Sequence, residues 1–290
     1  NVWSKMSPDA ALELLDANFG DAEVRSYAVR QLHSLSDDNL VDYLVQLIQV
    51  LKYEPYHDSF LARFLLGRAL SSRKVGHHFF WHLKAEVEQP AVSIRFALLL
   101  EAYLRGAGSY LDDLSRQNLV LTRLSDIALA IKSVKSSERK EVLTSKLAGT
   151  QLPETFQLAV MPQQEASSLI VEKCKYMDSK KLPLWLVFQN ADPIGKPVYV
   201  MFKSGDDLRQ DMLTLQMLNI MDKLWQANNM DLRMMPYGCI STGNEVGMIE
   251  VVLNAETVCK IQMVRKGKIG YWLLTRNNDY CLFCYCCCCY

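Results

Sequence analysis

The sequence predicts two structural classes in succession: a stack of α-helical hairpins, and then an α+β domain with an antiparallel sheet. Three observations support this prediction. Helical patterns follow one another almost without interruption from Ser7 to about Gly149, and short β-rich runs begin only afterwards. With 290 residues, half of them apolar, the chain has enough material for two hydrophobic cores.

The first helices are marked by capping residues. Ser7 precedes Pro8, which is a favoured first helical residue, and this helix should stop near Gly20. Asp21 should open the next helix, in which apolar residues recur at three-and-four spacing and form one face. Short helices of this kind, joined by polar turns, favour an armadillo- or HEAT-like stack, although no strict sequence repeat is present.

Further helices follow in the same manner. Ser36 or Asp37 should cap a helix that breaks at Pro55, and Asp58 should cap the one after it. Two more helices are expected before and after Pro90.

Composition excludes several kinds of site. The 32 basic and 32 acidic side chains cancel, so no overall field favours nucleic acid. No signal peptide or transmembrane segment is predicted.

His78 and His82 have a spacing that zinc could use, but no third ligand accompanies them, and a metal site is not predicted. Cysteines are sparse outside the last ten residues, which favours a reducing, cytoplasmic environment.

Strand patterns begin after a charged connector. LPLWLVFQ and PVYVMFK read as a hairpin, Asp206 or Asp207 should cap the helix that follows, and strands should return at Arg233–Ile240 and Gly247–Leu253. This order is that of a nucleotide-kinase N-lobe. The predicted domains are 1–150 (helical), 151–165 (linker), 166–263 (N-lobe) and 264–290 (an anomalous tail).

Phosphoryl transfer needs a fixed cation near the phosphates, and Lys203 at the end of an apolar strand could supply it. A solvated strand-end lysine is the plainer alternative. Neither GxGxxG nor GxxxxGK[ST] occurs in the 290 residues, which disfavours a protein kinase or a P-loop enzyme.

Four segments, MDSKKLPLW, FKSGDDLRQDM, DLRMMPYGC and GMIEVV, together resemble class I phosphoinositide 3-kinases. Upstream, AALELLDANF, YLVQLIQVLKYEPY and GHHFFWHLKAEV are similar to the helical accessory domain of that family. The resemblance covers roughly residues 3 to 263. GDDLRQD is shared with phosphatidylinositol 4-kinases, whereas PYGC combined with IEVV indicates class I, and VEKCKYMDSK indicates the beta and delta types.

The resemblance implies roles for individual residues. Lys203 would contact the phosphates of ATP, and Ser179 would hydrogen-bond them through its hydroxyl and backbone N–H. Met177, Trp185 and Met201 would cover the adenine.

The same resemblance places a polar pair, Asp211 and Tyr237, at the back of the pocket. It places the hinge between the lobes at Ile249, Glu250, Val251 and Val252. There the Glu250 carbonyl and the Val252 N–H would bind adenine through the backbone, so no acid or base role is implied for the Glu250 side chain.

The resemblance also implies ATP and Mg²⁺ as cofactors, with the metal ligands in a C-lobe. A phosphoinositide lipid at the membrane surface and an SH2-containing regulatory subunit would be partners, with recruitment from the cytoplasm to the plasma membrane. No GDRHxxN loop, DFG triplet or basic activation loop occurs in these 290 residues, so this chain alone should be inactive. A noncatalytic helical scaffold and a phosphatidylinositol 4-kinase are the alternatives.

The last residues, VRKGKIGYWLLTRNNDYCLFCYCCCCY, depart from the family pattern. Val264 and Arg265 can be encoded by a splice-donor sequence, so we expect the tail to be translated non-coding sequence. The adaptor-binding, Ras-binding and C2 domains that precede the helical domain in the family are also expected to be absent.

Overall fold

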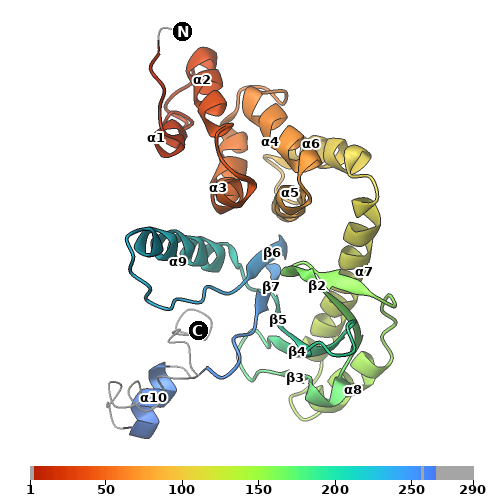
Figure 1. The fold of residues 1–290 in the computed structure, drawn as a ribbon. Coiled ribbons are helices and arrows are strands. Elements are labelled where there is room, and N and C mark those ends of the chain that lie inside the picture. Colours follow the sequence, from red (N-terminus) through yellow and green to blue (C-terminus); the bar gives the residue numbers. More distant parts are fainter. Residues whose placement is uncertain (1–2, 256–257, 266–290) are drawn as a thin grey trace. The chain divides into compact units, whose positions relative to one another are not determined.

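The computed structural model describes residues 3–255 and 258–265. Helices come first and the sheet follows, which confirms the predicted fold class (Figure 1). The helices of the first part are α1 (Pro8–Glu13), α2 (Ala22–Leu32), α3 (Asp37–Val50), the 3₁₀ helix η1 (Leu51–Tyr53), α4 (Phe60–Ser71), α5 (Arg73–Glu86), α6 (Ser93–Gly106), α7 (Tyr110–Lys132) and α8 (Arg139–Ala148).

Three predicted helix starts are confirmed. The side chains of Ser7, Asp21 and Ser36 each accept a backbone N–H from the first turn of the helix that follows. These bonds satisfy amides that have no partner inside a helix. Ser36, rather than Asp37, is therefore the cap of α3.

Two helix boundaries differ from the prediction. Helix α1 ends at Glu13 instead of continuing to Gly20, because the Asp16 carboxylate accepts the Asn18 N–H and forms a turn there. Helix α4 is capped by Ser59, whose hydroxyl accepts the Ala62 N–H, and not by Asp58. The Asp58 carboxylate instead binds the guanidinium of Arg63 one turn into the helix.

Helix α5 is the centre of the helical core. It packs against α3, α4 and α6, and these helices lie side by side in Figure 1. Its Phe79 and Trp81 are fully buried, and Phe96 of α6 is buried as well. Because an isolated helical hairpin cannot cover its own apolar face, this mutual burial is what stabilises the stack.

The chain forms two compact units. Among the described residues, the first covers the chain up to Arg116 together with Thr242–Asn244, and the second covers the others. The change of unit lies inside α7, well before the predicted domain boundary near residue 150. Helix α8 accordingly packs against the segment Lys175–Tyr176, which is strand β3 of the sheet.

The second unit is built on an antiparallel sheet. Its strands are β1 (Phe156–Leu158), β2 (Met161–Leu169), β3 (Lys175–Tyr176), β4 (Leu184–Asn190), β5 (Val198–Ser204), β6 (Cys239–Gly243) and β7 (Val246–Glu250). They neighbour one another in the order β1-β2-β4-β5-β7-β6, and β3 pairs with β4. A 3₁₀ helix, η2 (Val171–Lys173), lies between β2 and β3.

The segment expected to be a linker is part of this sheet. Strand β1 and the beginning of β2 lie within residues 151–165, so this predicted linker contributes strands to the sheet. Phe156 of β1 is buried and its ring packs edge-on against Phe188 of β4 at 5.7 Å. This tertiary contact orders a segment whose polar, Pro-containing sequence suggests a loop.

The predicted β4–β5 hairpin is confirmed, and helix α9 (Arg209–Ala227) follows β5 as expected. The strand predicted from Arg233 is irregular until Cys239, because Arg233 has a positive φ of 52° and Pro236 has no N–H to donate. Helix α10 (Val258–Arg265) lies at the end of the described chain. The rest of the anomalous tail, residues 266–290, lies outside the described residues.

In the part of the chain that the structure describes, none of the helices combines the length and the apolar character needed to cross a bilayer.

Candidate functional site

Strand β5 carries Lys203 near its carboxyl end. Side chains alternate along a strand, so Met201 and Lys203 point to the same face of the sheet. Lys203 is only 3% exposed, and its ammonium group donates to the Asp206 carboxylate over 2.8 Å. A buried cation is costly unless it is paired. The structure therefore places Lys203 in a largely dry position with Asp206 as its counterion.

Three predicted site residues form one row across the sheet. Trp185 on β4 lies opposite Met201 on β5, and Met201 lies opposite Ile249 on β7. Directly opposite residues of antiparallel strands share a face and lie about 5 Å apart at Cβ. The next position of β5 on that face is Lys203, opposite Gly247. The lysine thus borders a continuous apolar row.

An apolar cluster surrounds this row. Its buried members are Met201, Leu208, Ile249 and Val251. The partly buried side chains that pack against it are Met177, Trp185, Tyr199, Tyr237 and Cys239. Three predicted residues therefore meet at one place on the sheet: Met177 and Trp185 from neighbouring positions, and Tyr237 from more than 50 positions further along the chain.

The predicted hinge begins at Ile249, inside β7, and β7 ends at the next residue, Glu250. Its backbone N–H donates to the Gly238 carbonyl, and its carboxylate accepts the Gly238 N–H, both over 2.8 Å. A Cβ atom on Gly238 would meet the Val160 side chain at 3.0 Å and the Glu250 carboxylate at 3.3 Å. The motifs PYGC and IEVV are thus joined by a two-bond clamp, and the Glu250 side chain has a structural role. Val252, half-buried, follows outside the strand.

Ser179 lies in the loop between β3 and β4 and is exposed. Its backbone N–H donates to the Met177 carbonyl over 2.9 Å, and its own carbonyl accepts the Leu182 N–H. Of the two donors expected from Ser179, the backbone N–H is therefore engaged within the turn, and the hydroxyl is the group presented to solvent.

The remaining predicted residues lie near the start of α9. Asp211 is half-buried in its first turn. Asp207, predicted as a possible cap, accepts the backbone N–H of Arg209 and binds its guanidinium over 2.8 Å, which lowers the pKa of the Asp207 carboxyl. Because Leu208, rather than Asp206 or Asp207, is the residue that precedes the helix, the aspartates act from just outside it.

Within residues 3–255 and 258–265, no three His, Cys, Asp or Glu side chains are grouped so that they could hold a metal ion. His78 and His82 stack on one another at 6.0 Å on α5. Burial lowers the pKa of both imidazoles.

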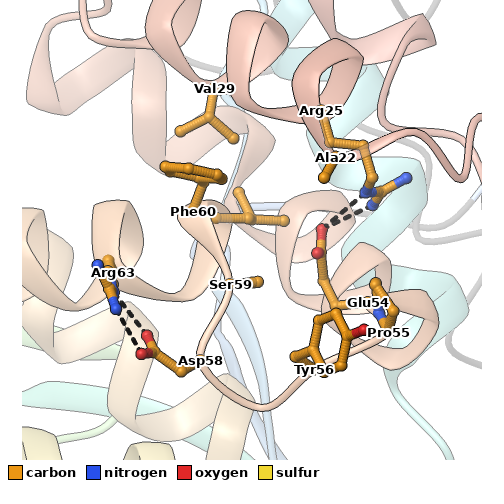
Figure 2. Close-up of a pocket in the computed structure, with 11 residues that line it drawn as sticks. Ala22, Arg25, Val29, Glu54, Pro55, Tyr56, Asp58, Ser59, Phe60 and Arg63 are labelled. Atoms are coloured by element: carbon orange, nitrogen blue, oxygen red, sulfur yellow. Dashed lines mark hydrogen bonds and ion pairs between the residues drawn. The ribbon is translucent and has the colours of Figure 1, made fainter.

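Figure 2 shows a separate cavity of about 170 Å³ within the helical unit. It lies between α2, the segment before α4 and the start of α4. A buried ion pair of 2.7 Å between Arg25 and Glu54 forms one side, and Val29 and Phe60 form the apolar part. None of the predicted site residues lines this cavity.

Comparison with known proteins bears on both units. Residues 1–116 match the accessory (PIK) domain of the phosphoinositide 3-kinase family, and residues 197–278 match the phosphatidylinositol 3- and 4-kinase domain. Phosphatidylinositol 3-kinase 2 of Dictyostelium discoideum is 54% identical over 90% of this chain, and phosphatidylinositol 3-kinase 1 of the same organism is 48% identical over 96%. The chain belongs to the phosphoinositide 3-kinase family.

The chain spans 14% and 18% of the length of these two phosphoinositide 3-kinases. The accessory-domain match ends at residue 116, where the compact helical unit ends as well. The kinase-domain match runs to residue 278, beyond residue 263, where the resemblance was expected to stop. The predicted family is thus confirmed, whereas the beta or delta type stays a prediction.

Sequence reasoning missed several contacts around the candidate phosphoinositide 3-kinase site. It did not foresee the Asp206 partner of Lys203, the clamp made by Glu250, or the lysines that bind the turn after β5. Lys181 is two positions after Ser179 in the same loop, and this closeness to a predicted phosphate-binding residue was a signal that could have identified it. Lys132 lies in a stretch that reads only as a charged helix end, so no sequence signal pointed to it.

Proposed function

We propose that this chain is the helical domain and nucleotide-binding N-lobe of an ATP-dependent phosphatidylinositol 3-kinase, which phosphorylates the 3-hydroxyl of phosphoinositides. One observation carries the proposal. Lys203 belongs to the segment that matches the kinase family. It lies buried at the end of β5, next to the apolar row of Trp185, Met201 and Ile249. A fixed cation beside a flat apolar surface suits a nucleotide triphosphate.

The residues around this row would divide the work of binding ATP. The Lys203 ammonium would contact the phosphates and balance negative charge that develops during transfer, while the exposed hydroxyl of Ser179 would add a hydrogen bond. Met177 and Trp185 would cover the adenine. The Glu250 carbonyl and the Val252 N–H would bind its edge, with Ile249 and Val251 packed beneath.

Asp211 and Tyr237 would close the back of the pocket. ATP fits the side chains present here, because the cation and the apolar cluster adjoin one another. Mg²⁺ would bridge the phosphates, and its protein ligands are expected in the C-lobe. The sequence of these 290 residues holds no catalytic loop and no DFG triplet, so residues 1–290 by themselves would bind nucleotide without transferring the phosphoryl group.

The enzyme that carries these residues would act in the cytoplasm and at the plasma membrane, on a phosphoinositide lipid and with an SH2-containing regulatory subunit. Class I membership is supported by PYGC in combination with IEVV, which the Gly238–Glu250 clamp joins physically. A noncatalytic helical scaffold is the second candidate, because the helical unit has its own core.

Substitution of Lys203 tests the proposal in the full-length kinase that carries these residues. Lys203→Met should lower phosphoryl transfer at least about 100-fold, because the buried charge is lost where the phosphates would lie. Lys196→Met, at an exposed lysine in the β4–β5 turn, should leave the rate unchanged. The product should carry phosphate at the 3-position; a 4-phosphorylated product would instead indicate a phosphatidylinositol 4-kinase.

The 290-residue chain gives a second readout. Mg-ATP should quench the fluorescence of Trp185 in the wild-type chain, and less so in Lys203→Met. A full-length kinase that retains its rate after Lys203→Met would overturn the role of Lys203. Binding of a regulatory subunit without any nucleotide binding would favour the scaffold.

A further inference from the structure

The turn at the end of β5, from Ser204 through Gly205 to Asp206, is held by two lysines from different elements. The ammonium group of Lys132, at the end of α7, donates to the Ser204 carbonyl. That of Lys181, in the loop between β3 and β4, donates to the Gly205 carbonyl. Two consecutive carbonyls of one turn are thus each bound by a cation, an arrangement stronger than a neutral hydrogen bond.

The opposite side of the turn is also bound. The N–H groups of Gly205 and Asp206 both donate to the Glu245 carbonyl, over 2.7 and 3.1 Å. Carbonyls and amides of the same turn therefore have partners from three separate segments. The orientation of its peptide planes, and with it the direction of the Asp206 side chain, is determined from outside the turn.

Gly205 is the residue that makes this arrangement possible. Its φ of +82° lies in the region that favours glycine, and a Cβ atom there would come within 3.0 Å of the Lys132 ammonium nitrogen. The space beside Gly205 is therefore the space that the Lys132 side chain uses.

The two ammonium groups are close enough to influence one another. Burial lowers the pKa of Lys132, and the charge of Lys181 lowers it further, while Glu245 and Asp206 act in the opposite direction. Bringing like charges together costs free energy, and here the Ser204 and Gly205 carbonyls offset that cost. The Lys132 side chain is held at the Ser204 carbonyl despite the nearby charge of Lys181, which indicates that it positions the turn.

We infer that Lys132 is a positioning residue: by binding the Ser204 carbonyl it fixes the turn whose Asp206 carboxylate holds the ammonium group of Lys203. The sequence of contacts is Lys132 to Ser204, through the turn to Asp206, and from Asp206 to Lys203 over 2.8 Å. The purpose of this positioning rests on the proposed function, in which Lys203 meets the phosphates.

Chemical reactivity of Lys203 tests the inference without any enzyme assay. The purified 290-residue chain is pulsed with an acylating reagent directed at amines, and modification of each lysine is followed by peptide mass spectrometry. In the wild-type chain Lys203 should react slowly, because it is buried and paired. Lys132→Met should raise the rate at Lys203 at least threefold, and Lys132→Arg, which keeps a cationic donor, should restore slow reaction.

Two controls separate a local effect from unfolding. Lys140→Met, at an exposed lysine on α8, should leave the Lys203 rate unchanged. Lys52, which pairs with Glu86 over 2.9 Å in the helical unit, should keep its rate in every variant. If Lys132→Met raises the rate at Lys52 as well, the experiment is repeated with Lys132→Gln. That variant should also raise the rate at Lys203 at least threefold.

The outcomes separate this inference from the proposed function. An unchanged Lys203 rate in Lys132→Met, or a raised rate that Lys132→Arg does not restore, overturns the positioning role. Mg-ATP should protect Lys203 in the wild-type chain. If it does not, the nucleotide role of Lys203 loses support, while a threefold rise in Lys132→Met still supports positioning by Lys132.

Discussion

At the scale of single residues, buried ionisable groups are stabilised in two ways in this chain. Arg25 and Glu54 are paired with one another: each is 5% exposed at its side chain, and they form an ion pair over 2.7 Å. His82, in contrast, is buried on α5, and its environment favours the neutral form. Burial is the main cause of its low pKa and the charge of His77 adds to it, while Glu86 acts in the opposite direction.

The stability of the helical unit should therefore depend on pH through His82. The folded pKa is about 4, against 6.5 for an unperturbed histidine. Above pH 7 both states are neutral. Below 6.5 the unfolded state binds the proton first, so the free energy of unfolding should fall as the pH drops, by up to about 3 kcal/mol at pH 4.

Chemical denaturation at pH 7 and at pH 5 measures this dependence. His82→Gln should reduce it, leaving the contribution of His78, whose pKa burial also lowers. His57→Gln, at an exposed histidine of the segment before α4, should leave it unchanged. Equal pH dependence in wild type and His82→Gln would contradict the assignment.

At the scale of elements, two helical glycines show how helix packing differs from helix propensity. Gly67 of α4 has nothing within 4 Å of the position that a Cβ would take. A Cβ on Gly76 of α5 would collide with the Tyr103 hydroxyl and lie 2.6 Å from the Ala69 carbonyl oxygen. Helix α5 therefore approaches α4 and α6 closely at Gly76, whereas Gly67 makes no such contact.

Alanine substitutions should separate these two situations. Gly67→Ala should raise the free energy of unfolding by about 0.5–1 kcal/mol, because alanine loses less backbone entropy in a helix. Gly76→Ala should lower it by about 1–3 kcal/mol, since neighbouring backbone must move. Thermal unfolding of the two variants, followed by circular dichroism, checks both signs; stabilisation by Gly76→Ala would show that the helices can move apart cheaply.

At the scale of the whole molecule, two units carry separate cores. The helical core is centred on α5, and the sheet core includes Phe188, which is fully buried on β4. Helix α7 contributes to both units, since the change of unit lies inside it. Two separate cores favour two unfolding transitions.

Calorimetry of the wild-type chain and of two variants tests this expectation. Glu54→Ala leaves Arg25 buried without its partner and should destabilise the helical unit by about 3–5 kcal/mol. Phe188→Ala leaves a cavity in the sheet unit and should cost about 3–5 kcal/mol there. Each substitution should lower one of two transitions and leave the other in place. A single transition lowered equally by both would show that the units unfold together.

Prediction from the sequence succeeded where the determining interactions are local. Ser7, Asp21 and Ser36 cap helices through bonds to the next few residues, and the β4–β5 hairpin follows from alternating side chains around a turn. It failed where distant groups decide. Residues 156–158 form a strand because Phe156 packs on Phe188, 32 positions further along the chain.

The same distinction between local and long-range interactions applies to the candidate site. The sequence by itself determined the family and predicted a phosphate-binding role for Lys203, because KSGDDLRQD, PYGC and IEVV are contiguous patterns. Only the tertiary structure decided that Trp185, Met201 and Ile249 share a row, that Glu250 clamps Gly238, and that Lys132 supports the turn beside Lys203. These contacts join residues between 12 and 72 positions apart, or arise from strand register, and no local pattern specifies a separation of that kind.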